Sequence, residues 1–168
     1  GLIEPNKVAW IEKEKPVAGP YDAVIRPTAI APCSSDVHTA FEGGAQKPTG
    51  FVLGHEALGE IVEVGEMVKE FKVGDKVVVP AGTPNWRARG IQEHNFKHSE
   101  GPFTSLKLSG TRDGVFAEFF MVNDADSNLA HMPLDISVDD AIMTVDMVTT
   151  GFSGAEMADI KFGDTVCV

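Results

Sequence analysis

The 168-residue sequence predicts a strand-rich α+β fold, and three observations support this fold class. Charged and apolar residues alternate over residues 60–64, as they do in a half-buried strand. Three consecutive valines within residues 76–80 follow a Val-Gly-Asp turn signal, which indicates a second strand. Helix-start signals are found at two places, near Ser34 and at Ser137, so short helices are expected beside the strands.

Two further strands are expected near the N-terminus, over residues 7–12 and 22–31. Turn residues that include Pro16 and Gly19 separate these strands. Because proline has no backbone N–H to donate, Pro27 predicts that the second of them lies at a sheet edge or is interrupted there.

A short helix is expected to follow, capped by Ser34 or Ser35 and ended by Gly43. Asp36 suits the positive N-terminal end of such a helix. The apolar face expected for this helix consists of Val37, Ala40 and Phe41.

Three residues around this helix have side chains suited to chemistry. Cys33 lies just before the helix start, where the local positive potential lowers the pKa of a thiol and favours the thiolate. Ser35 and His38 are three positions apart and therefore share one face of the first helical turns.

Residues 81–113 form the longest stretch without sustained periodicity. Loops longer than about 15 residues in compact domains are usually either functional or disordered. The aromatic side chains in this stretch, such as Trp86, Phe96 and Phe103, favour an ordered loop that contacts substrate or another subunit.

Residues 114–122 are the most strand-like segment of the chain, and the acidic residues 123–128 end it. The acidic cluster lacks the glycine and the terminal glutamate of an EF-hand loop, so a surface turn is predicted in place of a calcium site. A final strand is expected over residues 161–168.

A second helix is expected to open at Ser137 with a capping box, and Asp146 falls inside its apolar run over residues 141–148. A buried unpaired carboxylate costs roughly several kcal/mol, so Asp146 would then need a partner or a metal ion. Helical spacing equally allows Asp146 to face water.

Composition narrows the classes of partner. The chain has 25 acidic and 14 basic residues, a net charge of −11, and no basic cluster, which argues against nucleic acid and anionic membranes as partners. No apolar run approaches the length of about 18 residues needed to span a membrane, and the N-terminus lacks a signal-peptide core, so a cytoplasmic location is expected. Two cysteines exclude a four-cysteine structural zinc site.

The dipeptide His55-Glu56, between Gly54 and Gly59, is a candidate metal-binding element. Alone it reads most simply as a solvated loop, because His-Glu pairs are common. Together with Cys33 and Asp146, however, His55 could complete a three-ligand metal site.

The chain also resembles a known family, the zinc-dependent medium-chain alcohol dehydrogenases, and within it the bacterial NADP-dependent secondary alcohol dehydrogenases. The resemblance covers their N-terminal catalytic part and runs in family order. The matching stretches are residues 10–16, 31–38, 53–57, 113–116, 122–126 and 146–152.

This resemblance implies a GroES-like fold, which is a mainly β, partly open barrel with short helices. It further implies one catalytic Zn²⁺ held by Cys33, His55 and Asp146, with Glu56 able to approach as a fourth ligand, and no structural zinc. Ser35 and His38 would relay the proton of a small alcohol. The full-length relatives are expected to use NADP and to be homotetramers.

Two departures from the family pattern stand out. Family members often carry a tryptophan near the position of Leu106, which leaves the range of alcohols or ketones open. The glycine-rich turn that binds the cofactor pyrophosphate is absent, so no cofactor-binding residue is expected and the chain reads as a fragment.

The expected domain division is therefore a GroES-like zinc domain over residues 1–150, followed by a connecting helix and the first strand of a truncated dinucleotide-binding domain over 151–168. Such a fragment alone would be inactive as a dehydrogenase. The alternative is a non-catalytic GroES-like module that binds zinc or protein partners.

Overall fold

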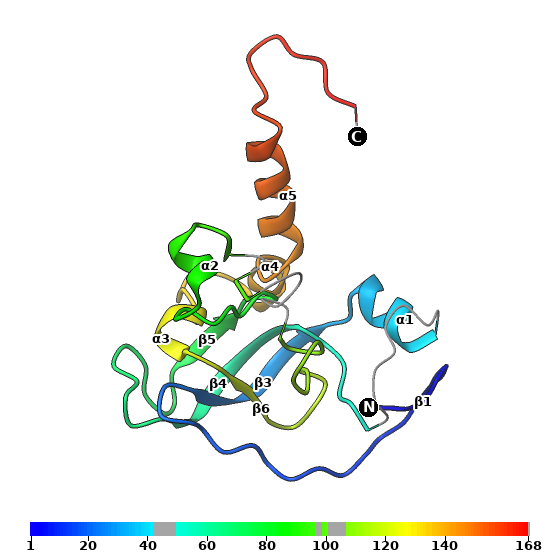
Figure 1. Cartoon of the computed structure of the whole chain (residues 1–168), viewed down its shortest axis with the longest axis vertical. Helices are drawn as coiled ribbons and strands as arrows, with labels where there is room; N and C mark the ends of the chain where they lie inside the picture. Colours follow the sequence, from blue (N-terminus) through cyan, green and yellow to red (C-terminus); the bar gives the residue numbers. More distant parts are fainter. Residues whose placement is uncertain (42–49, 97–98, 101–106, 168) are drawn as a thin grey trace.

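The computed structural model describes residues 1–41, 50–96, 99–100 and 107–167. Its centre is a five-stranded antiparallel sheet with the strand order β6-β3-β4-β5-β7 (Figure 1). The strands of this sheet are β3 (Ala23–Ala31), β4 (Glu56–Val64), β5 (Lys76–Val79), β6 (Phe120–Val122) and β7 (Ala130–His131). Because no ladder joins the edge strands β6 and β7 in the described part of the chain, the sheet is open, as expected for a partly open barrel.

The remaining elements are short. A small hairpin of β1 (Leu2–Glu4) and β2 (Lys7–Val8) lies at the N-terminus. The helices are α1 (Ser34–Phe41), α2 (Arg89–Gln92), α3 (Ala125–Asn128), α4 (Val138–Met143) and α5 (Met147–Met157). Among these helices, none has the length and apolar character required to cross a membrane.

The core lies against the two central strands of the sheet. Both β3 and β4 contribute fully buried side chains, including Ile25 and Ile61. Phe71, Val77 and Phe120, among others, add buried side chains to the cluster from other segments. Each such apolar side chain contributes about 1.5–3 kcal/mol when it is transferred from water to the interior, so this cluster is the main source of stability.

Pro27 interrupts the ladder as predicted. The register of β3 against β4 shifts between Pro27 and Ala29, and β6 pairs only with Ala23–Ile25 at the start of β3. In the described structure β3 is therefore central at its start and has only β4 beside it after Pro27. Both predicted consequences of Pro27 are therefore found: the strand is irregular at this position, and it has a described neighbour on one side only.

Helix α1 has the predicted position but a different buried face. Ala40 is buried, whereas Val37 and Phe41 are about half exposed, and the other buried side chain is Asp36. The predicted end of this helix at Gly43 lies outside the described residues.

The prediction of a strand over residues 114–122 is wrong for residues 114–119. Only Phe120–Val122 form a strand. The N–H groups of Gly114, Val115 and Phe116 donate instead to the carbonyls of Val52, Gly54 and Leu53. This close backbone contact requires a glycine, because a Cβ on Gly114 would lie 2.2 Å from the carbonyl oxygen of Gly54.

Two other predicted strands differ from the structure. Of residues 7–12, only Lys7–Val8 form a strand, in the hairpin with β1. Residues 161–167 have no strand, because no described segment lies beside them to supply ladder hydrogen bonds, and Val168 lies outside the described residues.

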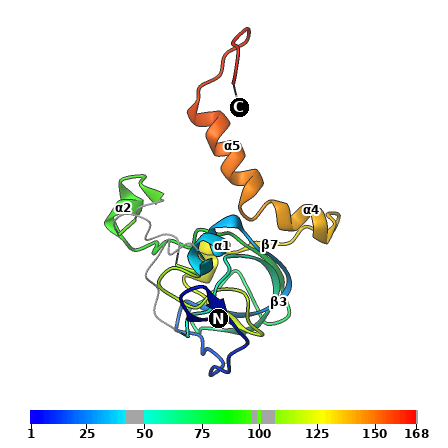
Figure 2. The same cartoon turned by 90° about the vertical axis from the view of Figure 1, so that its right-hand side faces the viewer.

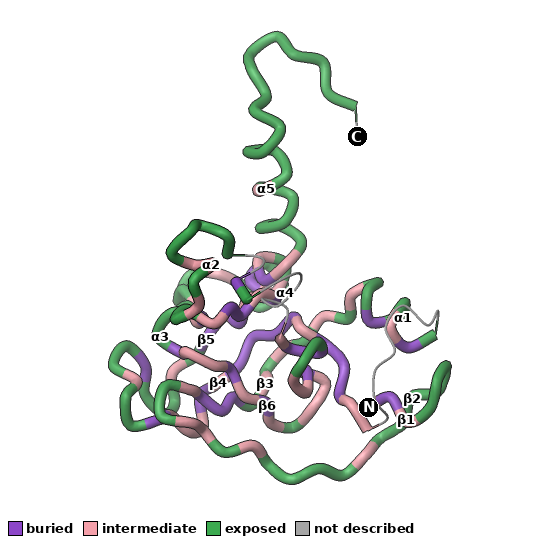
Figure 3. Tube along the Cα trace, in the orientation of Figure 1, coloured by how far each residue is buried: buried purple, intermediate pink, exposed green. Residues whose placement is uncertain are grey.

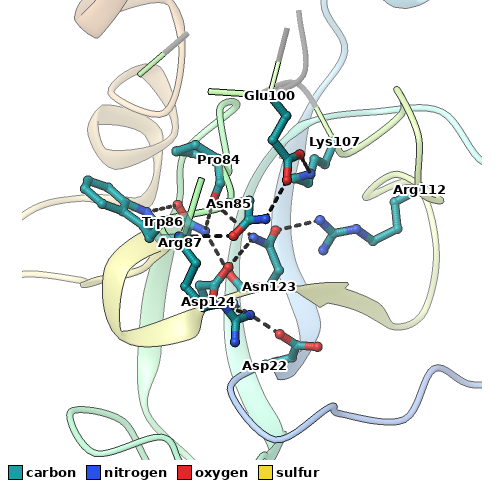
Figure 4. Close-up of polar contacts among 11 residues, drawn as sticks. Asp22, Pro84, Asn85, Trp86, Arg87, Glu100, Lys107, Arg112, Asn123 and Asp124 are labelled. Carbon is teal, nitrogen blue, oxygen red and sulfur yellow. Dashed lines mark hydrogen bonds and ion pairs between the residues drawn. The ribbon is translucent and has the colours of Figure 1, made fainter. Parts of the chain in front are cut away.

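The loop after β5 is held by a network of polar contacts (Figure 4). The carbonyl of Pro84 accepts hydrogen bonds from the side-chain amides of Asn123 (3.1 Å) and Asn128 (3.0 Å). Asn128 also accepts the indole N–H of Trp86 at 2.7 Å. The described part of this loop is thus bonded to the body of the molecule, whereas Phe103 lies outside the described residues.

The surface turn predicted over residues 123–128 is only partly found, because Ala125–Asn128 form the short helix α3, in which Ala125 and Asn128 are buried. The acidic side chains of this segment contact other parts of the protein. The carboxylate of Asp126 accepts the backbone N–H groups of Lys69 and Glu70, at 2.8 and 2.9 Å. Asp124 forms an ion pair with Arg87 at 3.0 Å.

The chain after residue 146 leaves the body of the molecule. Helix α5 and residues 158–167 project away from the sheet, and nearly all of their side chains are exposed (Figures 1 to 3). We call residues 147–167 the C-terminal arm. None of the residues of α5 is buried, although Met147, Val148, Phe152 and Met157 are apolar.

Candidate metal centre

The candidate ligands meet at one end of the sheet because neighbouring strands run antiparallel. Strand β3 ends at Ala31, which pairs with Glu56 at the start of β4. Cys33 therefore lies two residues beyond the end of one strand, and His55 one residue before the start of the next.

Asp146 reaches the same end of the sheet through strand β5. The N–H of Ala81, two residues after β5, donates to the carbonyl of Val145 at 3.0 Å. Val145 is buried against Leu58 and Ala141, and this places its neighbour Asp146 beside His55.

Asp146 does not lie inside a helix, so that part of the prediction is wrong. Helix α4 ends at Met143, and Asp146 is the N-cap residue of α5 with a non-helical φ of −141°. The chain breaks its helical conformation here to bond Val145 to Ala81, a long-range contact that the continuous apolar run does not reveal.

The four predicted ligand residues are brought together by the fold. Cys33, His55, Glu56 and Asp146 each offer one donor atom, and all four atoms lie within 4.8 Å of one another. His55 Nε2 is 3.6 Å from Asp146 Oδ2 and 3.9 Å from Glu56 Oε1. Ligand atoms around a tetrahedral zinc at about 2.0–2.3 Å are themselves separated by about 3.3–3.8 Å. The 3.6 Å separation from Asp146 lies within this range, and the 3.9 Å separation from Glu56 is slightly longer.

The chemistry of the donor set also fits zinc. One sulfur, one imidazole nitrogen and carboxylate oxygens are the ligand types that zinc prefers, whereas calcium and magnesium require oxygen ligands throughout. The thiolate and one carboxylate would balance the charge of a divalent cation. In the part of the chain that the structure describes, this is the one such cluster of three or more donors.

Asp36 is a site residue that the sequence analysis missed. Its side chain is buried, and its two oxygens accept the backbone N–H groups of Cys33 and Gly54, each at 3.0 Å. Asp36 Oδ1 also lies 3.6 Å from His55 Nδ1. One carboxylate thus holds both ligand-bearing segments and faces the side of the imidazole opposite the donor cluster, as supporting groups of metal sites commonly do.

The ionisation of the site follows from these contacts. Burial alone would lower the pKa of His55, but the hydrogen bond and charge of Asp36 and those of Cys33 raise this pKa to about 9. Burial raises the pKa of the Cys33 thiol, yet hydrogen bonds from Ser35 and the nearby His55 outweigh burial and leave this pKa lowered. Burial and the charge of Asp146 raise the pKa of Glu56.

Ser35 and His38 are both exposed residues of α1. The hydroxyl of Ser35 hydrogen-bonds the sulfur of Cys33, which ties the serine to the ligand set. The exposure of His38 gives its imidazole access to solvent.

A separate cavity of about 290 Å³ lies between residues 10–16 and residues 112–121. None of the four donor residues lines this cavity, so it is not part of the candidate metal centre.

Comparison with known proteins points to one family. Residues 19–134 match the family described as the alcohol dehydrogenase GroES-like domain. The chain is 56% identical over 167 residues to an NADP-dependent isopropanol dehydrogenase of Thermoanaerobacter brockii, covering 99% of this chain and 47% of that protein. It is 54% identical to the enzyme of the same name from Entamoeba histolytica, with 99% and 46% covered.

A solved structure shows the same fold. The alcohol dehydrogenase TADH from Thermus sp. ATN1 superposes with a TM-score of 0.82 at 28% sequence identity, covering 96% of this chain and 47% of that one. The present chain thus spans about half the length of the relatives that it matches.

Proposed function

This chain belongs to the alcohol dehydrogenase GroES-like domain family, and from the donor cluster at the end of its sheet we propose that it forms the zinc-binding, catalytic half of an NADP-dependent alcohol dehydrogenase. The substrates would be small secondary alcohols and their ketones, by analogy with the isopropanol dehydrogenases that it resembles. The observation that carries the proposal is the convergence of Cys33, His55, Glu56 and Asp146.

Zinc would be held by Cys33, His55 and Asp146, with a fourth position left for substrate. When bound, the ion supplies Lewis-acid polarisation of an alcohol or carbonyl oxygen. Glu56 is the secondary ligand, because a second carboxylate gives the site surplus negative charge. Its raised pKa and its position 3.9 Å from the histidine nitrogen agree with that role.

The protein's own residues orient the ligands and move the proton. Asp36 engages the Nδ1 side of His55, so that Nε2 faces the other donors. Ser35 would accept the alcohol proton and pass it to His38, which is exposed and can release it to water.

NADP would accept the hydride, and the residues that bind it would lie outside this chain. We propose that residues 1–150 form the zinc domain and that residues 151–168 lead into a dinucleotide-binding domain. The predicted boundary falls within α5 (Met147–Met157). We further propose that the whole protein is a cytoplasmic homotetramer, with neither nucleic acid nor membrane as a partner, and with one catalytic zinc per chain and no structural zinc.

Metal analysis by mass spectrometry after dialysis tests the site directly. The wild-type chain should retain about one Zn²⁺, and a Cys33→Ser, His55→Ala double variant should lose it, because two of three ligands are gone. Glu56→Ala should weaken binding less than His55→Ala does. Full zinc occupancy in the double variant would contradict the proposed site.

An activity assay then distinguishes two hypotheses, a catalytic half of a dehydrogenase and a non-catalytic zinc-binding module. The 168-residue chain should show no NADP-dependent oxidation of isopropanol, whereas a fusion to the second half of the Thermoanaerobacter brockii relative should show it. If both proteins bind zinc and neither turns over, the chain is better described as a non-catalytic module.

A further inference from the structure

Two neighbouring threonines in the first turn of α5 bond the same residue in different ways. The hydroxyl of Thr149 donates to the backbone carbonyl of Asp146 at 2.8 Å. The hydroxyl of Thr150 donates to the carboxylate oxygen Oδ1 of Asp146, also at 2.8 Å. Only the second contact acts on the candidate metal ligand itself.

The carboxylate of Asp146 is not used to cap the helix that it precedes. An aspartate at an N-cap usually accepts a backbone N–H from the second or third helical residue. Asp146 makes no such bond, although it is the N-cap residue of α5. Its two oxygens have different neighbours: Oδ1 accepts a hydrogen bond from the Thr150 hydroxyl, and Oδ2 lies 3.6 Å from His55 Nε2.

Asp146 also differs from the other ligands in how it is supported. Cys33 and the segment before His55 are bonded to the buried carboxylate of Asp36, and Glu56 is buried at the start of β4. The side chain of Asp146 is 21% exposed, and the residue lies between two helices and is not adjacent to a strand of the sheet. Its backbone is fixed through Val145, which leaves rotation of the carboxylate to be restrained by other contacts.

We propose that Thr150 is a positioning residue of the metal centre, whose hydroxyl holds Oδ1 of Asp146 so that Oδ2 is presented to the ion as a single ligand atom. This inference rests on the proposed zinc function. Hydrogen bonds to the outer atoms of metal ligands fix ligand orientation, and removing one commonly weakens metal binding by about 10–100-fold.

The chain offers a matched control for this role. Thr149→Val and Thr150→Val remove the same hydroxyl from adjacent, exposed positions of the same helical turn, and each removes one hydrogen bond to Asp146. Thr150→Ser keeps a hydroxyl at the decisive position. Valine preserves the branched shape of threonine, so helix propensity changes little.

The experiment measures Zn²⁺ affinity by chelator competition and records the visible absorption of the Co²⁺-substituted proteins, using the 168-residue chain and the three variants. Thr150→Val should bind Zn²⁺ about 10-fold more weakly and show an altered Co²⁺ spectrum, because the carboxylate is free to turn. Thr149→Val should stay within about 2-fold of wild type with an unchanged spectrum, and Thr150→Ser should behave like wild type.

The outcomes separate this inference from the proposed function. Wild-type affinity and spectrum in Thr150→Val would overturn the positioning role while leaving the metal centre intact. Equal losses in Thr149→Val and Thr150→Val would also overturn it, because a general effect on α5 would then explain both. A wild-type chain that binds neither Zn²⁺ nor Co²⁺ would overturn the metal centre and the role of Thr150 with it.

Discussion

The body of the molecule and the C-terminal arm contain similar apolar residues, but these side chains differ in burial. In the body, Ile25 of β3 and Ile61 of β4 are fully buried. In the arm, Phe152 is 65% exposed, and Ile160 and Met157 are also exposed (Figure 3). The two regions meet at Asp146, the last of the four donor residues along the chain.

This contrast shows that apolar character stabilises a segment only where a partner surface is present. The strands of the body pack their side chains against one another, whereas no described segment covers the arm. In this chain, therefore, the free energy of unfolding resides in the body. The candidate metal centre draws three of its donors from the body and one from its boundary with the arm.

The largest expected effect is in the sheet. Ile61→Ala removes a side chain that is 0% exposed at the centre of the core, and it should lower the free energy of unfolding by about 2–5 kcal/mol. Urea denaturation followed by circular dichroism measures this loss. A loss below about 1 kcal/mol would mean that the core does not dominate the stability of the body.

Zinc affinity at the candidate metal centre, which lies at the boundary between the two regions, should depend on pH. Because the pKa of His55 is raised to about 9, its Nε2 carries a proton at pH 7, and zinc must displace that proton to bind. Apparent zinc affinity should therefore rise by about tenfold per pH unit for each proton displaced, and this rise should level off above pH 9. Chelator competition between pH 6 and 10 measures the dependence.

Asp36→Asn should sharpen this test. Removing the carboxylate charge beside Nδ1 takes away the main influence that raises the pKa of His55, so the pH dependence should move to lower pH. An unchanged pH profile in this variant would show that Asp36 does not control the protonation of His55.

The smallest expected effect is in the arm. Ile160→Ala makes the same chemical change as Ile61→Ala at a position that is 45% exposed, and it should alter the free energy of unfolding by less than about 0.5 kcal/mol. The same urea titration provides the direct comparison. Losses of similar size at the two isoleucines would remove the distinction between body and arm.

Local sequence signals predicted the elements whose partners are close in sequence or whose pattern is strong. Alternation identified β4, the valine run identified β5, and the capping box placed the start of α4 at Ser137, whose hydroxyl accepts the N–H of Asp140. Pro27 marked the irregularity in β3. In each case the physical cause lies within a few residues of the signal.

Long-range backbone contacts account for what the sequence did not reveal. Residues 114–116 are strand-like in composition, but their N–H groups bond to carbonyls about sixty positions earlier, at 52–54. The helical break before Asp146 depends on the bond from Ala81 to Val145. Neither contact leaves a pattern in the segment that it reshapes.

The candidate site was predicted more completely than its support. Ligand chemistry and family resemblance selected Cys33, His55, Glu56 and Asp146, and the fold brings these four together, although zinc binding itself stays a prediction. Asp36 was assigned only to the end of a helix, because its bond to the N–H of Gly54 spans 18 positions. Its place three residues after a candidate ligand cysteine was the one available signal.

The spread of the donor residues along the chain has a consequence for folding. Cys33 and Asp146 are separated by 113 positions (146 − 33), so an ion that binds both closes a very long loop. In an unfolded chain, closing a loop of about this length costs roughly 5 kcal/mol of conformational entropy. Folding of the sheet already removes this conformational entropy, because it brings the end of β3, the start of β4 and the end of β5 together before the ion binds. Zinc uptake would therefore come late in folding and would act as a cross-link between the first and last parts of the body.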